Sequence, residues 1–208
     1  MDFRIFWPDF GIFIAFLLLP ALFLGGFGKF QKLLLINLIS LLIHQFEEYR
    51  FPGYFPGMLN VVMFESETPD RYPLNTNTAM LINVFIGWLS YGIAFLFHEN
   101  ALFLAIATTM VSFGNFVAHT LLFNIKGKLC YNPGMLSSII LFFPLSIAIT
   151  ISIIKLKPTL LSYASGIALG IILNYIGILK MIDWLKDPNT KYIFPPRFLI
   201  QPNTPTND

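Results

Sequence analysis

The segment LLLINLISLLIHQFEEYRFPG, Leu33 to Gly53, decides the fold, because its run of apolar residues ends in one imidazole, two carboxylates and a guanidinium. The apolar part approaches the roughly 17 to 25 residues that a membrane helix needs. In a helix, His44, Glu47 and Glu48 stand at i, i+3 and i+4 and share one face. One small site can therefore hold all three side chains.

The predicted helix ends beside its two carboxylates. Pro52 disfavours helical geometry at the residue before it, so the helix should end near Arg50. Glu47 and Glu48 then lie in the last turn, next to the partial negative charge of the terminal carbonyl groups. Two carboxylates there require a compensating cation, and Arg50, a metal ion and a proton are the alternatives.

The composition is that of a membrane protein. Of 208 residues, 56% are hydrophobic, 12% are charged and 23 are Phe, whereas soluble domains have roughly 25% charged residues. The net charge of +2 and the absence of basic runs give no reason to expect nucleic-acid binding. Cys130 is the one cysteine, so no intrachain disulfide can form.

The hydropathy pattern predicts an all-α fold, a polytopic bundle of about six transmembrane helices in one domain over residues 1–180. The helices are expected at about 9–27, 32–49, 79–97, 101–123, 134–154 and 160–180. The connection 51–78 contains a short apolar stretch and is expected to be an interfacial flap. Residues 181–208 form a polar C-terminal tail. A stripe of small residues on the last helix predicts a helix–helix partner at Ser162, Gly166 and Gly170.

The charge distribution predicts that both termini are cytoplasmic. Six spans leave nine Lys and Arg residues on the side of the termini and four on the opposite side. The same alternation brings the ends of the second and fourth helices and the starts of the third and fifth helices to one side. Polar groups so placed inside a membrane bundle point to function, and here they are His44, Glu47, Glu48, Asn83, Asn115, His119 and Tyr131.

Three motifs give the chain a resemblance to a known family. They are His44-x-x-Glu47-Glu48, Asn115 to His119, and Tyr131-Asn132-Pro133-Gly134. Together they resemble the HXXEE family of small integral membrane proteins, over about residues 30–145. That family has no assigned activity, so the resemblance implies a fold and a set of positions, and no reaction.

Two kinds of chemistry fit the cluster. Imidazole with carboxylate oxygens suits Zn, Mn or non-haem Fe, with His44, Glu48 and His119 as ligands of one ion. Without a metal, Glu47 and Glu48 can act as acid and base, and Tyr131 is a candidate hydrogen-bond donor. Asn83, Asn115 and Arg50 are expected to support either site, and Glu47 either joins the site or pairs with Arg50.

The predicted function is a membrane-embedded enzyme acting on a lipophilic substrate that arrives sideways beneath the 51–78 connection. A proton-coupled transporter or channel with the same residues as relay groups is the alternative, and a non-catalytic membrane subunit is another. The simplest interpretation is a solvated helix end, in which a Glu to Arg50 bridge contributes little, with Asn115 and His119 making helix–helix hydrogen bonds.

Overall fold

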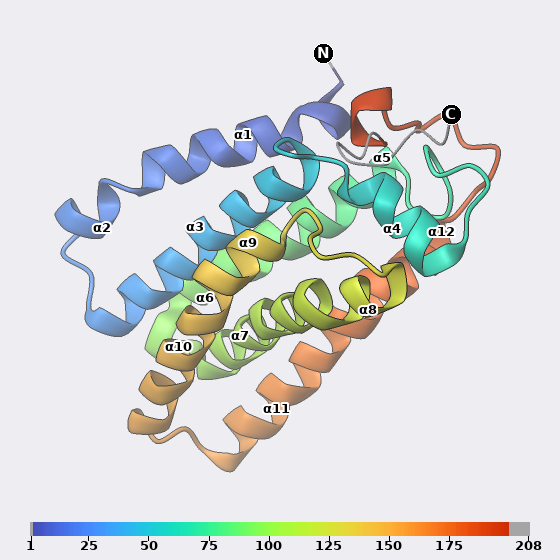
Figure 1. Ribbon diagram of the computed structural model, residues 1–208. Helices are drawn as coiled ribbons and strands as arrows, with labels where there is room; N and C mark the ends of the chain where they lie inside the picture. The colour runs from blue at the N-terminus through green and yellow to red at the C-terminus, as the bar shows by residue number, and fades with distance from the viewer. Residues whose placement is uncertain (1, 200–208) are drawn as a thin grey trace.

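The computed structural model describes residues 2–199, which form helices and connecting loops (Figure 1). Within this range no strand is present, so the predicted all-α class is confirmed. The long helical segments are α1 (Phe3–Leu18) with α2 (Ala21–Leu24); α3 (Lys29–Tyr49); α5 (Thr76–Met80), η1 (Leu81–Trp88) and α6 (Leu89–Phe97); α7 (Leu102–Val117), η3 (Ala118–Leu122) and α8 (Phe123–Gly127); α9 (Met135–Ser137), η4 (Ser138–Phe142) and α10 (Phe143–Lys155); and α11 (Leu160–Ile171), η5 (Ile172–Lys180) and α12 (Met181–Leu185). The stretches η1, η3, η4 and η5 are π-helical.

Four continuous helical stretches within residues 2–199 are long and apolar enough to cross a membrane: Phe3–Leu24, Thr76–Gly127, Met135–Lys155 and Leu160–Leu185. The second has 52 residues, roughly 78 Å at 1.5 Å per residue. It reverses at His98, where φ is 31°, and the short 3₁₀ helix η2 (His98–Ala101) leads into α7. Figure 1 shows α6 and α7 running back along each other.

The helix α3 is the centre of the bundle and lies against α1, α6 and α10 (Figure 1). Its Leu35, Leu38 and Leu42 are buried in one cluster with Ala15 of α1 and Tyr91 of α6. Most of its polar side chains are buried as well. Because lipid offers no hydrogen bonds, these polar groups depend on partners within the protein.

Several helix ends differ from the predicted positions. The first helix begins at Phe3 rather than near residue 9, because the side chain of Asp2 caps it by accepting from Arg4 N at 3.1 Å. The helix α3 begins at Lys29 rather than at residue 32. The last helix continues through α12 to Leu185, into the segment predicted as a polar tail. The part of that tail at 200–208 lies outside the described residues.

The small-residue stripe on α11 packs against α7 of the same chain. A Cβ atom on Gly166 would lie 2.7 Å from Cβ of Ile106, and one on Gly170 would lie 2.6 Å from Sδ of Met110. Ser162 contacts Thr159 at the start of α11, with 3.0 Å between the two hydroxyl oxygens. The close approach that the stripe predicted is therefore made within the chain, and Gly166 and Gly170 are buried there rather than presented to another protein.

One end of the bundle is covered by the 51–78 connection and by residues 181–199. The connection contains α4 (Phe55–Phe64), whose Phe55 and Met58 are buried together with Phe194 and Phe198. Phe198 belongs to the short helix η6 (Pro196–Phe198). Figure 1 shows α4, α12 and η6 at the same end as the start of α1. The segment expected as a flap is thus a ten-residue helix packed onto the bundle.

Candidate metal centre

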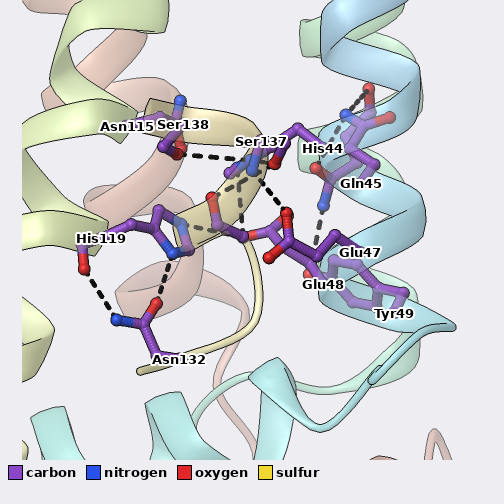
Figure 2. Close-up of polar contacts among 12 residues, drawn as sticks. His44, Gln45, Glu47, Glu48, Tyr49, Asn115, His119, Asn132, Ser137 and Ser138 are labelled. Carbon is purple, nitrogen blue, oxygen red and sulfur yellow. Dashed lines mark hydrogen bonds and ion pairs between the residues drawn. The ribbon is translucent and has the colours of Figure 1, made fainter. Parts of the chain in front are cut away.

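Three buried ligand groups converge beneath α4. His44 and Glu48 are one turn apart on α3, and His119 projects toward them from η3 (Figure 2). Oε1 of Glu48 is 3.6 Å from Nε2 of His44 and 3.3 Å from Nε2 of His119. The imidazole rings stand at 88° with centroids 4.8 Å apart. Residue exposures are 2%, 5% and 1% for His44, Glu48 and His119, so the group is shielded from solvent.

The imidazole of His119 is oriented by Asn132. The amide nitrogen of Asn132 donates to the carbonyl oxygen of His119 and to Oδ1 of Asn124, both at 2.7 Å. These two bonds fix the amide, so its Oδ1 accepts from Nδ1–H of His119 at 2.6 Å. The remaining ring nitrogen, Nε2, carries a lone pair in neutral imidazole, and this lone pair faces Glu48.

Ser137 orients His44 in the same way. The hydroxyl of Ser137 donates its one hydrogen to the carbonyl of Gly134 at 3.2 Å, so it accepts from Nδ1–H of His44 at 2.9 Å. Nε2 of His44 then presents a lone pair toward Glu48 and has no hydrogen-bond partner among residues 2–199. A buried polar atom without a partner is costly and calls for an explanation.

The convergence of three lone-pair donors requires a positive charge between them. Two imidazole nitrogens and a carboxylate repel one another in a dry site unless a proton or a metal ion joins them. The three ligand atoms lie within 4.8 Å of one another. Ligand atoms around one tetrahedral zinc ion are about 3.3 Å apart, given metal–ligand distances of roughly 2.0–2.2 Å, and both Glu48 distances are close to this value. Second ring nitrogens held by fixed acceptors are also typical of metal ligands.

Glu47, the other acid of the motif, binds the start of a different helix. Its Oε2 accepts from the backbone N of Ser137 at 2.8 Å, and its Oε1 accepts from the backbone N of Leu136 at 3.1 Å. A carboxylate at a helix N-terminus satisfies unpaired N–H groups and the positive end of the helix dipole. Tyr131 donates its hydroxyl proton to Oε1 of Glu47 at 2.8 Å, and burial together with this bond raises the pKa of Tyr131 above its ordinary value. Glu47 and Tyr131, predicted as catalytic groups, thus anchor the segment that orients the imidazoles.

Gly134 lets this segment approach both imidazole rings. Its φ is +97°, and an added Cβ would lie 2.5 Å from Cε1 of His119 and 2.8 Å from Cε1 of His44. Any larger residue would therefore strain the backbone and displace a ring. Residues 131–138 form one clamp: Asn132 holds His119, Ser137 holds His44, and Gly134 passes between them.

Arg50, one of the three alternatives for the compensating cation, binds other partners than the acidic pair. Its guanidinium binds Asp9 of α1, with Nε to Oδ1 at 2.6 Å and Nη2 to Oδ2 at 2.5 Å. It also donates to the carbonyl oxygens of Tyr49 and Ile5. Arg50 is the C-cap that follows the last residue of α3, with a non-helical φ of −133°, so its side chain leaves the helical face shared by the acids. With Arg50 on Asp9 and Glu47 on α9, Glu48 is left with the two imidazoles alone.

Two of the amides predicted to support the site, Asn83 and Asn115, line a cavity beside the triad of His44, Glu48 and His119. The cavity has a volume of about 290 Å³ and is bounded by α3, α4, η1, α7, η3 and η5. Asn115 lines it and donates to the carbonyl of Val111 at 3.0 Å. Asn83 also lines the cavity, and its Oδ1 accepts from Nε2 of Gln45 at 3.0 Å. Phe64, Leu122 and Leu179 line the cavity and are also exposed, so it reaches the surface between α4, η3 and η5.

Sequence reasoning missed Ser137, Gln45 and Tyr49. Ser137 follows the Tyr-Asn-Pro-Gly turn by three residues, and a serine in the first turn of a helix was the available signal. Gln45 and Tyr49 are one turn apart on α3, on a helical face next to that of His44 and Glu48. Polar side chains on two neighbouring faces of one membrane-length helix indicate that both faces contact protein rather than lipid, and this was the available signal for Gln45 and Tyr49.

Comparison with known proteins supports the grouping of these motifs. The family model described as a protein of unknown function with HXXEE motif matches residues 35–149, a range from α3 into α10 that contains the triad and the clamp. Searches of curated proteins and of solved structures find no match. Since the family model covers more than half of the 208 residues, the chain belongs to the HXXEE family, whose function is unknown.

Proposed function

We propose that this protein is a membrane-embedded enzyme in which His44, Glu48 and His119 bind one divalent transition-metal ion that acts on a lipid-soluble substrate. Zn, Mn and Fe are the ions that two imidazoles and one carboxylate suit. Catalytic zinc sites have three protein ligands and leave the fourth position to water or substrate. Three ligands in a cavity that reaches the surface match this pattern, and such an ion activates a bound water or polarises a carbonyl group.

One observation carries the proposal: both Nδ1 atoms are committed to fixed acceptors, so both Nε2 lone pairs face the carboxylate of Glu48. Nε2 of His44 is buried without a partner in the described residues. A helix end in contact with water, the simplest interpretation of the motif, would not bury these groups to this degree.

The proposal includes six spans with both termini in the cytoplasm. The turn at His98 divides the 52-residue stretch into two membrane-length halves, and α3 has 21 residues, enough for a span whose polar groups face protein. The one cysteine gives a direct test. Cys130 is exposed in the loop before α9 and is expected to react with a membrane-impermeant maleimide from the cytoplasmic side. Labelling from the opposite side alone would reverse the orientation.

The metal proposal is tested by elemental analysis of the purified protein. Wild-type protein is expected to hold about one transition-metal ion per chain, and His119→Ala and Glu48→Gln are expected to lose it while still inserting and purifying. Ser90→Ala is the matched control, because Ser90 lines the same cavity and its hydroxyl donates to the carbonyl of Gly87 at 3.1 Å rather than to the metal ligands.

If the protein binds no metal, the same three residues must have a different function. If wild-type protein reconstituted with Zn²⁺, Mn²⁺ and Fe²⁺ binds none of them, the metal enzyme is wrong, and the positive charge between the three groups is a proton. Acid–base catalysis and a proton relay would then be the remaining functions. A relay through the membrane needs further ionisable groups deeper in the bundle.

A further inference from the structure

We propose that the cavity binds a single-chain lipid whose oxygen-bearing head lies between the triad and the hydroxyl of Tyr49, with its hydrocarbon chain directed toward the opening between η3 and η5. This inference rests on the proposed function for the metal ion, and it adds the substrate class and a residue that contacts the substrate. It is carried by a second hydrogen-bond network, separate from the clamp, that joins Trp88, Gln45, Asn83 and Tyr49.

The hydrogen bonds of this network all point the same way, from Trp88 as the first donor to Tyr49 as the last acceptor. Nε1 of Trp88 donates to Oε1 of Gln45 at 2.6 Å, and Nε2 of Gln45 donates to Oδ1 of Asn83 at 3.0 Å. Nδ2 of Asn83 donates to the hydroxyl oxygen of Tyr49 at 3.3 Å and to the carbonyl of Ala79 at 2.9 Å. Because an indole N–H can only donate, each amide along the series is fixed in one orientation.

The network ends on a hydroxyl group that still has a proton to give. Tyr49 accepts from Asn83, and no acceptor within residues 2–199 lies at hydrogen-bonding distance from its hydroxyl. The residue is 3% exposed and lines the cavity. Its ring is held edge-on against Trp7, with centroids 4.8 Å apart. A buried tyrosine hydroxyl normally donates to a partner, and a ligand in the cavity would be that partner.

The position of Tyr49 specifies the ligand head. Tyr49 follows Glu48 directly on α3, and both residues line the cavity. A ligand group that contacts both the triad and Tyr49 must accept a hydrogen bond from the Tyr49 hydroxyl. It must also offer a lone pair to the cation proposed at the triad. A carbonyl, alcohol or similar oxygen fulfils both requirements, whereas an ammonium head has no lone pair for either contact.

The remainder of the cavity specifies an apolar chain. Beyond the polar groups near Glu48, its walls are mostly aliphatic and aromatic, with Ser90 and Asn174 as the polar exceptions, and its exposed margin consists of Phe64, Leu122 and Leu179. Two of these residues lie in helical stretches apolar enough to cross a membrane. An opening of this composition admits a hydrocarbon chain and excludes polar solutes. A volume of about 290 Å³ is near the lower end of the roughly 300–1,000 Å³ of small-molecule sites, which suits one chain better than two.

The test uses dodecanoyl hydroxamic acid with a diazirine at the end of its chain, in nanodiscs containing the full-length protein. The hydroxamate supplies oxygen atoms for a metal and for Tyr49, and the diazirine marks the residues that the chain contacts. Crosslinks are expected at Leu122 and Leu179, which line the cavity at its opening, in excess over Leu121, which is also exposed but lies outside the cavity. Acetohydroxamic acid, which lacks the chain, should compete only at concentrations more than about 100-fold higher than unlabelled dodecanoyl hydroxamate.

Tyr49→Phe removes the proposed donor and keeps the ring. We expect this variant to load Co²⁺ as wild-type protein does and to bind the probe about 10- to 100-fold more weakly, as for a lost hydrogen bond to a charged group. The readouts are the visible spectrum of bound Co²⁺ and the crosslinking yield. Tyr175→Phe is the matched control, because Tyr175 is exposed and lies outside this cavity. This variant should bind the probe as wild-type protein does.

The results separate this inference from the metal proposal. Unchanged probe affinity in Tyr49→Phe would mean that its proton is used inside the protein, and equal affinity for the two hydroxamates would mean that no chain site exists; either result overturns the inference with the metal site intact. Failure of wild-type protein to load Co²⁺ would refute the metal centre instead. Crosslinking at Leu122 and Leu179 needs no metal, so its absence would still refute the lipid site.

Discussion

The clamp predicts that Gly134→Ala damages the site more than its backbone strain alone explains. Alanine at a positive φ costs about 1 kcal/mol. At Gly134 the new methyl group would also lie 2.5 Å from Cε1 of His119 and 2.8 Å from Cε1 of His44. Both rings are held at Nδ1 and packed against Phe side chains, so relieving the overlap costs about 1–3 kcal/mol more.

Gly26 provides the matched control for this variant. Its φ is +62° and no atom lies within 4 Å of an added Cβ, so Gly26→Ala carries the conformational cost without the overlap. In thermal unfolding of the purified proteins, Gly134→Ala should melt lower than Gly26→Ala by roughly 2–12 °C, taking 2–4 °C per kcal/mol for a chain of this size.

Metal content gives an independent readout of the same variant. If the overlap displaces the clamp, the imidazoles lose their orienting partners, and metal affinity should fall about 10- to 100-fold, whereas Gly26→Ala should keep wild-type affinity. Equal melting temperatures and equal metal affinities for the two variants would show that the clamp does not touch the imidazoles as described.

Three further predictions concern the residues around the triad. Asn132→Ala should lower metal affinity about 10- to 100-fold, measured by competition with a chelator, because His119 loses its Nδ1 acceptor; unchanged affinity would contradict the orienting role. Glu47→Gln should destabilise the protein by about 1.5–3 kcal/mol in chemical unfolding, since it replaces charge-assisted bonds to the start of α9, and an unaffected midpoint would argue against that anchor. Arg50→Ala and Asp9→Ala should show a coupling of about 1 kcal/mol in a double-mutant cycle, because Asp9 is half exposed, and both should retain metal; loss of metal in either would return Arg50 to the site.

The helices were largely predictable, because the membrane constrains length and composition so strongly. Errors occurred where a charge found a partner that hydropathy does not reveal. The first helix was expected from about residue 9, yet α1 begins at Phe3 and runs through Asp9, whose charge is neutralised by Arg50 at the end of α3. The stripe at Gly166 and Gly170 correctly indicated close packing, but a periodic pattern does not state whether the neighbouring helix belongs to the same chain.

The site was predictable in its members and not in their partners. Helical spacing places His44 and Glu48 on one face, and the topology brings His119 to the same depth. The direction of the Arg50 side chain does not follow from that spacing, because Arg50 lies just beyond the end of α3. The sequence therefore did not decide whether Glu47 joins the site or pairs with Arg50. The hydrogen-bond partners of Glu47 and His44 lie about 90 residues further along the chain, and no local pattern connects positions so far apart.

This separation along the chain has a consequence for biogenesis. During synthesis, α3 emerges carrying a histidine and two carboxylates, while Ser137 and the start of α9 follow 90 residues after Glu47. Until then these groups have no stable place in hydrocarbon, so α3 can settle fully in the bilayer only after residues 131–138 have been made. A ribosome-bound chain that exposes residues only up to 128 should therefore leave α3 extractable from the membrane, and one that exposes residues through 155 should retain it. The last steps of insertion and the assembly of the triad are, on this account, one event.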